Sequence, residues 1–180
     1  MLGFGITPIT PADFMGRVED YVKENVGLPA DCCFLTLATD DQHIKIPPAS
    51  RFVVITPMRF PPWQGVVSGA SETGFDVAFR TTVFCRLTND QELRASRILR
   101  DNTDGVLYTM FRVVQALQLW TMPVDENPEL SYLREPMRIS GSGPELVTKR
   151  QEANPWILCW INWEARVTCI QNPATLISAP

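Results

Sequence analysis

The feature that most constrains the fold is a stretch in the middle of the chain, Phe75 to Thr88, in which apolar and polar side chains alternate. One parity carries the apolar side chains, with a single threonine among them: Phe75, Val77, Phe79, Thr81, Val83, Cys85 and Leu87. The opposite parity is mostly polar: Asp76, Arg80, Thr82, Arg86 and Thr88. Successive side chains of a strand point to opposite faces, so this pattern predicts a β-strand with one face in the core.

The length of this strand is informative as well. Extended over its full length it would span about 45 Å, whereas a compact domain of this chain length is about 40 Å across. We therefore expect the strand to bend at a bulge or to reach beyond its own core. An overhanging strand edge is a template for pairing with another chain.

A second long strand is predicted at Trp156 to Ile170. Apolar residues fill one parity: Ile157, Cys159, Ile161, Trp163, Ala165, Val167 and Cys169. The other parity is apolar at its start and then polar: Trp156, Leu158, Trp160, Asn162, Glu164 and Arg166. The first half is thus apolar on both faces. We expect the two long strands to form the spine of one sheet.

Two amphipathic helices are expected to cover the odd-numbered face of the final strand. The first spans Pro11 to Val26, where Thr10 provides an N-cap and Gly27 a stop. The second spans Asp104 to Trp120. Their apolar stripes are Phe14, Val18, Tyr21 and Val22 in the first, and Val106, Leu107, Met110, Phe111, Val114 and Leu117 in the second.

The remaining segments are predicted as short elements and long loops. Shorter strands are expected at Cys33–Thr39, Arg51–Arg59 and Met137–Ser140, and a short helix at Asp90–Arg100. Loops are expected at 40–50, 60–74, 125–135 and 141–154. The whole predicts an α+β fold: one domain over residues 1–180, with an N-terminal arm (1–10) and a C-terminal tail (171–180). Its core is a small mixed, mainly antiparallel sheet, flanked by helices on one face and joined by long loops.

Composition narrows the classes of function. Charged residues are 20% of the chain, the formal net charge is -4, and Lys and Arg are scattered without a cluster. This pattern is not typical of a dedicated nucleic-acid binder. No secretory signal and no membrane span of about 20 apolar residues is recognised. Of the five cysteines, Cys85, Cys159 and Cys169 lie on inward strand faces, and we expect them to be unbridged and mostly buried.

No catalytic, cofactor-binding or metal site is predicted. The only histidine, His43, sits in a polar segment typical of a solvated loop. Cys32 and Cys33 lack the gap of a zinc knuckle. Gly69 to Gly74 has the outer spacing of a phosphate loop, but Phe75 stands where lysine is required and a strand follows where a helix is needed.

Two groups of side chains are candidates for self-association or for contact with another protein. Pro61, Pro62 and Trp63 lie in the predicted loop 60–74 and would form a stiff apolar tip. Trp156, Leu158 and Trp160 form the second group, which either the long loops or a second subunit must cover. We expect a second subunit, since the loops are polar.

The order of these elements resembles that of the tail terminator and tail-completion proteins of long-tailed bacteriophages. The resemblance rests on the helix Pro11–Val26, the alternating run from Phe75 to Arg80, the helix end Val113–Leu117 and the closing strand from Trp156 through Val167. It covers most of the chain, and the predicted loops 60–74 and 125–154 are longer than is usual in that family.

The resemblance implies a structural virion protein without enzymatic activity or a cofactor. It would form a homohexameric ring at the head-proximal end of the tail, assembled in the host cytoplasm. Its partners would be itself, the tail tube protein and a head-side connector or stopper, with DNA passing through the lumen unbound and no membrane involved. Two alternatives stay open: another head-tail connector or minor tail protein, and a small cytoplasmic enzyme or ligand-binding domain with an unrecognised site.

Overall fold

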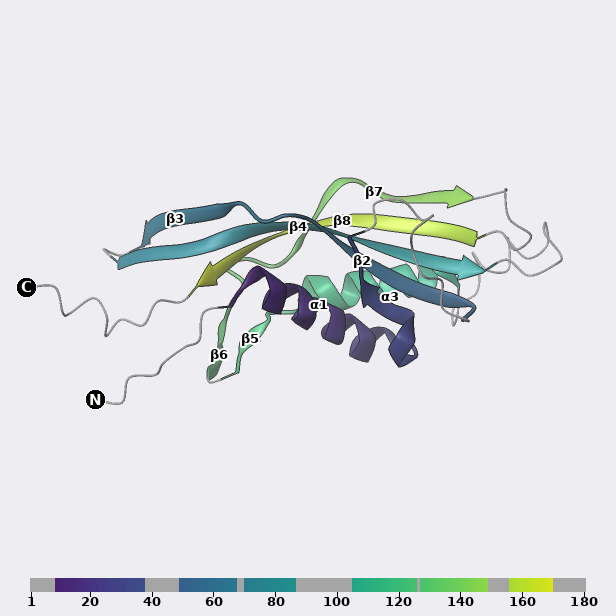
Figure 1. Cartoon of the computed structure of the whole chain (residues 1–180), viewed down its shortest axis with the longest axis horizontal. Coiled ribbons are helices and arrows are strands. Elements are labelled where there is room, and N and C mark those ends of the chain that lie inside the picture. The colour runs from purple at the N-terminus through teal and green to yellow at the C-terminus, as the bar shows by residue number, and fades with distance from the viewer. Residues whose placement is uncertain are drawn as a thin grey trace, which may run out of the picture.

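The computed structural model describes residues 9–37, 49–67, 70–86, 105–125, 127–148 and 156–169. These residues form two α-helices, a six-stranded sheet and a separate two-stranded hairpin. Both helices lie on one face of the sheet (Figure 1). Five strands follow the order β1-β2-β4-β8-β7, and β3 pairs with β4; only the β1–β2 pair is parallel. The predicted fold class, a mixed and mainly antiparallel sheet with helices on one face, is confirmed.

The two long strands are neighbours, as predicted. β4 (Ala70–Arg86) and β8 (Trp156–Cys169) pair in antiparallel register from Thr73 opposite Cys169 to Arg86 opposite Trp156. The other strands of the sheet are β1 (Cys33–Leu35), β2 (Arg51–Arg59), β3 (Pro62–Val67) and β7 (Arg138–Thr148). Since β4 and β8 are flanked by β2 and β7, their paired backbone groups lie in the middle of the sheet.

The first helix, α1, spans Pro11–Val26 as the sequence predicts. Thr10 and Asp13 form a capping box: the Thr10 hydroxyl accepts from the Asp13 N–H, and the Asp13 carboxylate accepts from the Thr10 N–H. Gly27 ends the helix in the left-handed region, at φ 70°. The boundaries follow from local chemistry at each end.

The second helix, α3 (Val106–Leu119), buries half of the predicted stripe: Val106, Met110 and Leu117. Leu107 and Phe111 are exposed, whereas Thr109, Val113 and Ala116 are buried. Ten of the 14 residues of this helix are apolar or aromatic and occur on every side of it, so periodicity alone could not select the side that faces α1 and the sheet. Gly105 is the N-cap. The short helix predicted at Asp90–Arg100 lies outside the described residues.

The odd-numbered faces of β4 and β8 form the core beneath the helices. Phe14 of α1 contacts Phe75 and Phe79 edge to face, at ring-centroid distances of 6.2 and 6.3 Å. Trp163 is fully buried, and its Nε1 donates a hydrogen bond of 2.9 Å to the buried Thr81 hydroxyl. The four described cysteines, Cys32, Cys33, Cys85 and Cys159, are free and buried. This agrees with the prediction for Cys85 and Cys159, two of the three cysteines that were expected to be unbridged and mostly buried. The Cys169 side chain is outside the described part.

Three predicted loops are wrong. The predicted loop 60–74 contains β3, whose partner is the first part of β4. The predicted loop 125–135 contains β6 (Asn127–Ser131), which forms a hairpin with β5 (Pro123–Val124) just before the loop. The third, 141–154, is strand as far as Thr148 in β7. In each case proline or glycine suggested a loop, but strands at a sheet edge or beside a bulge tolerate both. The strand predicted at Cys33–Thr39 ends at Leu35.

Candidate functional site

A projecting β-hairpin is the most distinctive part of the structure. β2 and β3 pair in succession with β4, and between them the Asp76 N–H donates to the Pro61 carbonyl at 2.9 Å. The chain from Arg51 to Arg86 is therefore one long hairpin. We call its distal part, residues 62–67 and 70–75, the hairpin arm.

The arm reaches beyond the rest of the fold. The 17 residues of β4 extend over about 56 Å at the usual rise of a strand, against about 40 Å for a compact domain of this size. Figure 1 shows β3 and the start of β4 running past the ends of both helices. The pairing of β4 with β8 begins only at Thr73, so residues 70–72 pair with β3 alone.

Trp63 lies at the base of the arm, opposite Gly74 and on the face turned away from the helices. A Cβ at Gly74 would come within 2.8 Å of the Trp63 ring and 2.0 Å of the Val167 carbonyl oxygen. Glycine is thus what allows the indole to lie on β4 while β8 passes alongside. Trp63 is half-buried, so the prediction of an exposed loop tip at this residue is wrong.

Two arginines flank the Trp63 ring. The guanidinium carbons of Arg134 and Arg166 lie 5.7 and 5.6 Å from its centroid. Arg166 is held by Asp76, with Nε to Oδ1 at 2.8 Å, and this hydrogen bond raises the pKa of Arg166. The Trp63 Nε1 atom is buried and has no hydrogen-bond partner. These contacts join the arm to β8 and to the turn after β6.

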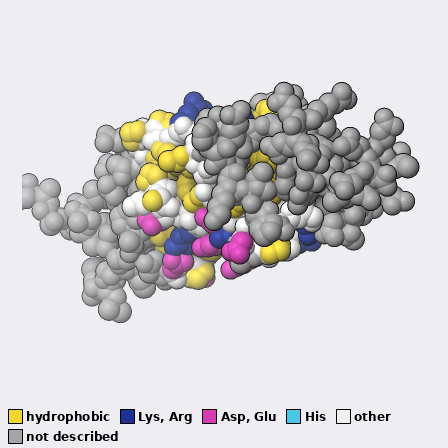
Figure 2. Space-filling model, turned by 45° about the vertical axis from the view of Figure 1, so that its right-hand side comes forward, with side chains coloured by type: hydrophobic (Ala, Val, Ile, Leu, Met, Phe, Trp, Pro, Cys, Tyr) yellow, Lys and Arg dark blue, Asp and Glu magenta, His cyan; other side chains and the backbone are white. Residues whose placement is uncertain are grey.

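Pro61 and Pro62 are exposed beside Trp63, and Met58 at the end of β2 is 53% exposed. Figure 2 shows one face of the molecule, where hydrophobic side chains gather above acidic and basic ones. The members of the first candidate group therefore differ in role. Pro61 and Pro62 offer exposed apolar surface, whereas the half-buried Trp63 fixes the arm. Proline restricts the chain here, so this surface is stiff.

The members of the second candidate group, Trp156, Leu158 and Trp160, also differ in burial. Leu158 is only 8% exposed within the single chain, on the face where Phe52 and Phe84 stack at 4.6 Å. Trp160 is half-buried, and the Arg80 guanidinium lies 4.3 Å from its ring centroid. The Trp156 backbone pairs with Arg86, but its side chain lies outside the described part. Within this group, Trp160 is therefore the only described side chain that offers surface for a contact.

A polar cavity of about 240 Å³ opens on the same outer face, between β2, β4, β8 and the start of β7. Its charged lining residues pair with one another: Arg59 with Glu164 at 2.9 Å, Arg166 with Asp76, and Arg138 with Glu135. No sequence signal predicted this cavity, because two of its three ion pairs, Arg59 with Glu164 and Arg166 with Asp76, join residues that are far apart in the sequence and meet only across the sheet. Each of its arginines already has a carboxylate partner, so the cavity offers no uncompensated positive charge for an anion.

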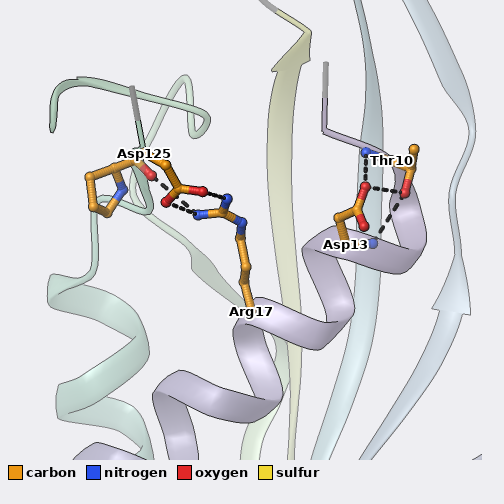
Figure 3. A network of polar contacts seen from close by, with 5 residues as sticks. Thr10, Asp13, Arg17 and Asp125 are labelled. Carbon is orange, nitrogen blue, oxygen red and sulfur yellow. Dashed lines mark hydrogen bonds and ion pairs between the residues drawn. The ribbon is translucent and has the colours of Figure 1, made fainter. Parts of the chain in front are cut away.

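A further polar network joins α1 to the β5–β6 hairpin (Figure 3). Arg17 donates to Asp125 and to the Pro123 carbonyl, and its guanidinium lies 5.4 Å from the Tyr132 ring centroid. The hydrogen bond from Arg17 lowers the pKa of Asp125, and the hydrogen bonds from Thr10 lower the pKa of Asp13. This network fixes the small hairpin at the end of α1 that lies near the arm.

The other residues that the sequence offered as candidates for a metal or catalytic site do not form such a site among the described residues. No group of three His, Cys, Asp or Glu side chains there could hold a metal ion, and His43 lies outside it. Burial raises the pKa of Cys33 to about 12 and that of Cys159 to about 11, so neither thiol ionises readily. Gly74, from the rejected phosphate-loop pattern, lies within β4. No helix among the described residues is long and apolar enough to cross a membrane.

Comparison with known proteins adds no family. No protein-family model matches the sequence, and no curated protein matches it significantly.

Proposed function

We propose that this chain is a ring-forming tail terminator of a long-tailed bacteriophage, which caps the tail tube and joins it to the head-side connector. The observation that carries the proposal is the hairpin arm. It projects from a compact sheet-and-helix body, and no described strand pairs with the outer edge of β3. An arm of this kind stabilises little within its own subunit and is suited to reach a neighbour.

A projecting arm of this kind is compatible with a closed ring. A projection on one side that binds a different surface of the next copy makes a head-to-tail contact, and such contacts close into rings when the rotation per subunit allows. The resemblance noted in the sequence favours six copies, and the native mass of the purified protein tests this number. Pro61, Pro62 and Trp160 are the proposed contact residues toward the neighbouring subunit or the tail tube.

The charge of the chain supports a passive lumen. Its formal net charge is -4, and the three arginines that line the outer-face cavity are paired with carboxylates. A lumen lined by such a surface would not hold passing DNA. We expect the purified protein to bind duplex DNA weakly or not at all.

Another head-tail connector or minor tail protein would share the ring but use a different neighbour. The proposal is therefore tested with purified tail tubes that lack their terminator: the added protein should bind at one tube end and stop further tube growth. A ring that leaves growth unchanged would favour the connector alternative. The outer-face cavity is what favours a ligand-binding domain, and a monomer that binds a small polar molecule there would support that alternative.

A matched pair of substitutions tests the contact surface. Pro62→Glu places a charge on the exposed base of the arm, and Pro29→Glu makes the same change at an exposed proline beyond the opposite end of α1. We expect the Pro62 variant to lose ring formation or tube binding and the Pro29 variant to keep both. Equal behaviour of the two variants would contradict the assignment of this surface.

A further inference from the structure

The turn after α3 contains a strained residue. Met122 has a φ of 46°, in the left-handed region that a residue with a long side chain rarely adopts. It is the one non-glycine residue of the described structure with a positive φ, and the following Pro123 restricts its backbone further. Such strain persists only where the surrounding contacts hold it, and it is typical of segments that switch between conformations. The contacts around Met122 therefore decide what this turn can do.

Met122 is held by the core and by the small hairpin that follows it. Its side chain is fully buried, and its carbonyl accepts a hydrogen bond of 3.0 Å from the Tyr132 N–H. The preceding carbonyl, that of Thr121, accepts a hydrogen bond from the Ser131 hydroxyl. Since Ser131 ends β6 and Tyr132 follows it, the strained turn and the β5–β6 hairpin are fixed together.

The chain after β6 returns to the main sheet at the base of the hairpin arm. Residues 132–134 lie along β8 and are joined to it by backbone hydrogen bonds of 2.9 and 3.0 Å. Leu133 is directly opposite Val167 in this short pairing. The Arg134 guanidinium lies 5.7 Å from the centroid of the Trp63 ring. One continuous set of contacts thus leads from the strained turn to the arm.

We infer that Met122 is a strained hinge for a clamp that closes on the base of the arm. The clamp consists of the β5–β6 hairpin and residues 132–134. In the closed position, which the structure shows, residues 132–134 pair with β8 and Arg134 lies beside the Trp63 ring. In the open position the Met122 backbone relaxes to a negative φ, the pairing with β8 is lost, and the base of the arm is released.

Opposing effects set the balance between the two positions. Burial of Met122, Val124 and Tyr132, each at most 2% exposed, favours closure. The backbone strain opposes closure, and the separate two-stranded sheet of β5 and β6 stabilises itself little. The ion pair of Arg17 with Asp125 also adds little, because its carboxylate is 69% exposed (Figure 3). The closed position is therefore the major one, and the open position is a minor state that leaves the main sheet intact.

The clamp and the arm favour each other's closed arrangement. Coupling between two sites is reciprocal, so whatever holds the arm in its present orientation also favours closure of the clamp. A neighbour that binds the arm, as in the proposed ring, would thus close the clamp. This last consequence rests on the proposed function, whereas the hinge itself does not.

Amide hydrogen exchange in dilute protein tests the hinge. The amides of Tyr132, Arg134 and Thr168, which donate the hydrogen bonds of the closed clamp, should exchange together. They should exchange at least about tenfold faster than the Trp163 amide in the middle of β8, since opening of the clamp leaves the sheet folded. Equal exchange of all four amides would overturn the inference, because the clamp would then open only when the whole chain unfolds.

A comparison of glycine with alanine isolates the strain. Met122→Gly and Met122→Ala both remove the buried side chain, but only alanine keeps the cost of a left-handed backbone. The Tyr132 amide should therefore exchange about fivefold more slowly in the glycine variant than in the alanine variant. Met137 is the matched control, because it is buried without a positive φ; there the β7 amides should exchange faster in the glycine variant. Slower exchange with alanine at position 122 would overturn the inference.

A disulfide tests the coupling between the clamp and the arm. Leu133 and Val167 face each other across the short pairing, so Leu133→Cys with Val167→Cys can form a disulfide that locks the clamp. The reporter is the Asp76 amide, which donates to the Pro61 carbonyl at the base of the arm. Oxidation should slow its exchange about tenfold, and reduction, which leaves the same side chains in place, should restore it. An Asp76 amide that does not respond would overturn the inference.

Assembly of the same variant separates this inference from the proposed ring. The oxidised chain should assemble at a concentration several-fold lower than the reduced chain. If the lock slows exchange at Asp76 but no ring forms at any concentration, the proposed function fails and the hinge is supported. If a ring forms but the lock hinders it, the proposed function stands and the inferred role of closure is overturned.

Discussion

Trp63 offers a sharp test of how the arm is fixed, because its ring is half-buried while its buried Nε1 donor has no acceptor. Replacing it by alanine removes the ring and the unpaired donor together. Replacing it by phenylalanine removes the donor and keeps most of the ring. The two substitutions therefore separate the contribution of packing from the cost of the buried N–H.

The magnitudes can be worked from burial. A tryptophan that is half-buried hides about 100 Å², worth about 2.5 kcal/mol at the usual coefficient. An unpaired buried donor costs about 1–3 kcal/mol. The two flanking guanidiniums lie near water, so we assign them no energy. Trp63→Ala should then lower the free energy of unfolding by about 1 kcal/mol, whereas Trp63→Phe, which keeps most of the buried ring and removes the unpaired donor, should raise it by about 1 kcal/mol.

Urea unfolding of both variants, followed by circular dichroism, measures these differences. Trp163→Phe is the matched control, because the Trp163 Nε1 does have an acceptor, the buried Thr81 hydroxyl. That variant should lose about 2 kcal/mol. The reasoning is refuted if Trp63→Phe is destabilised as much as Trp63→Ala, since Nε1 must then donate a hydrogen bond in the folded protein.

Three further predictions concern the body of the protein. Gly74→Ala should lower the free energy of unfolding by about 1–3 kcal/mol through overpacking against the Val167 carbonyl, with faster amide exchange along the arm; unchanged exchange would contradict the close approach. At pH 8 a thiol reagent should modify Cys33 and Cys159 only upon unfolding, because burial raises both pKa values; prompt reaction would show that they are accessible. Asp13 and Asp125 have lowered pKa values in the folded protein, so their contribution to stability is present above the ordinary aspartate pKa near 3.8 and is lost as the pH falls below it. The double substitution to asparagine should flatten that part of the stability–pH profile, and an unchanged profile would count against both networks.

The sequence predicted those parts of the fold in which local chemistry or one-sided burial decides the outcome. The capping box at Thr10 and the stop at Gly27 mark α1 without help from the rest of the chain. β4 and β8 each bury one full face, which imposes strict alternation over many residues. The same pattern identified the faces that carry Phe75 and Trp163.

Features that depend on strand register could not be predicted. Asp76 and Arg166 are 90 residues apart and meet because they are partners across β4 and β8. β3 was missed because Pro62 and Gly65 are typical of loops, and only its pairing with β4 makes the segment a strand. Trp63 was expected at an exposed loop tip; its half-buried position at the base of the arm depends on the close approach at Gly74, which the sequence pattern does not show.

The central claim, that the chain is a ring subunit, is tested most directly by the native mass of the purified protein. A single chain has a mass of 20.3 kDa. At micromolar concentration we predict a closed species whose mass is an integral multiple of this value, with six copies expected, and a ring in electron micrographs. A mass equal to one chain at every concentration up to the millimolar range would contradict the account.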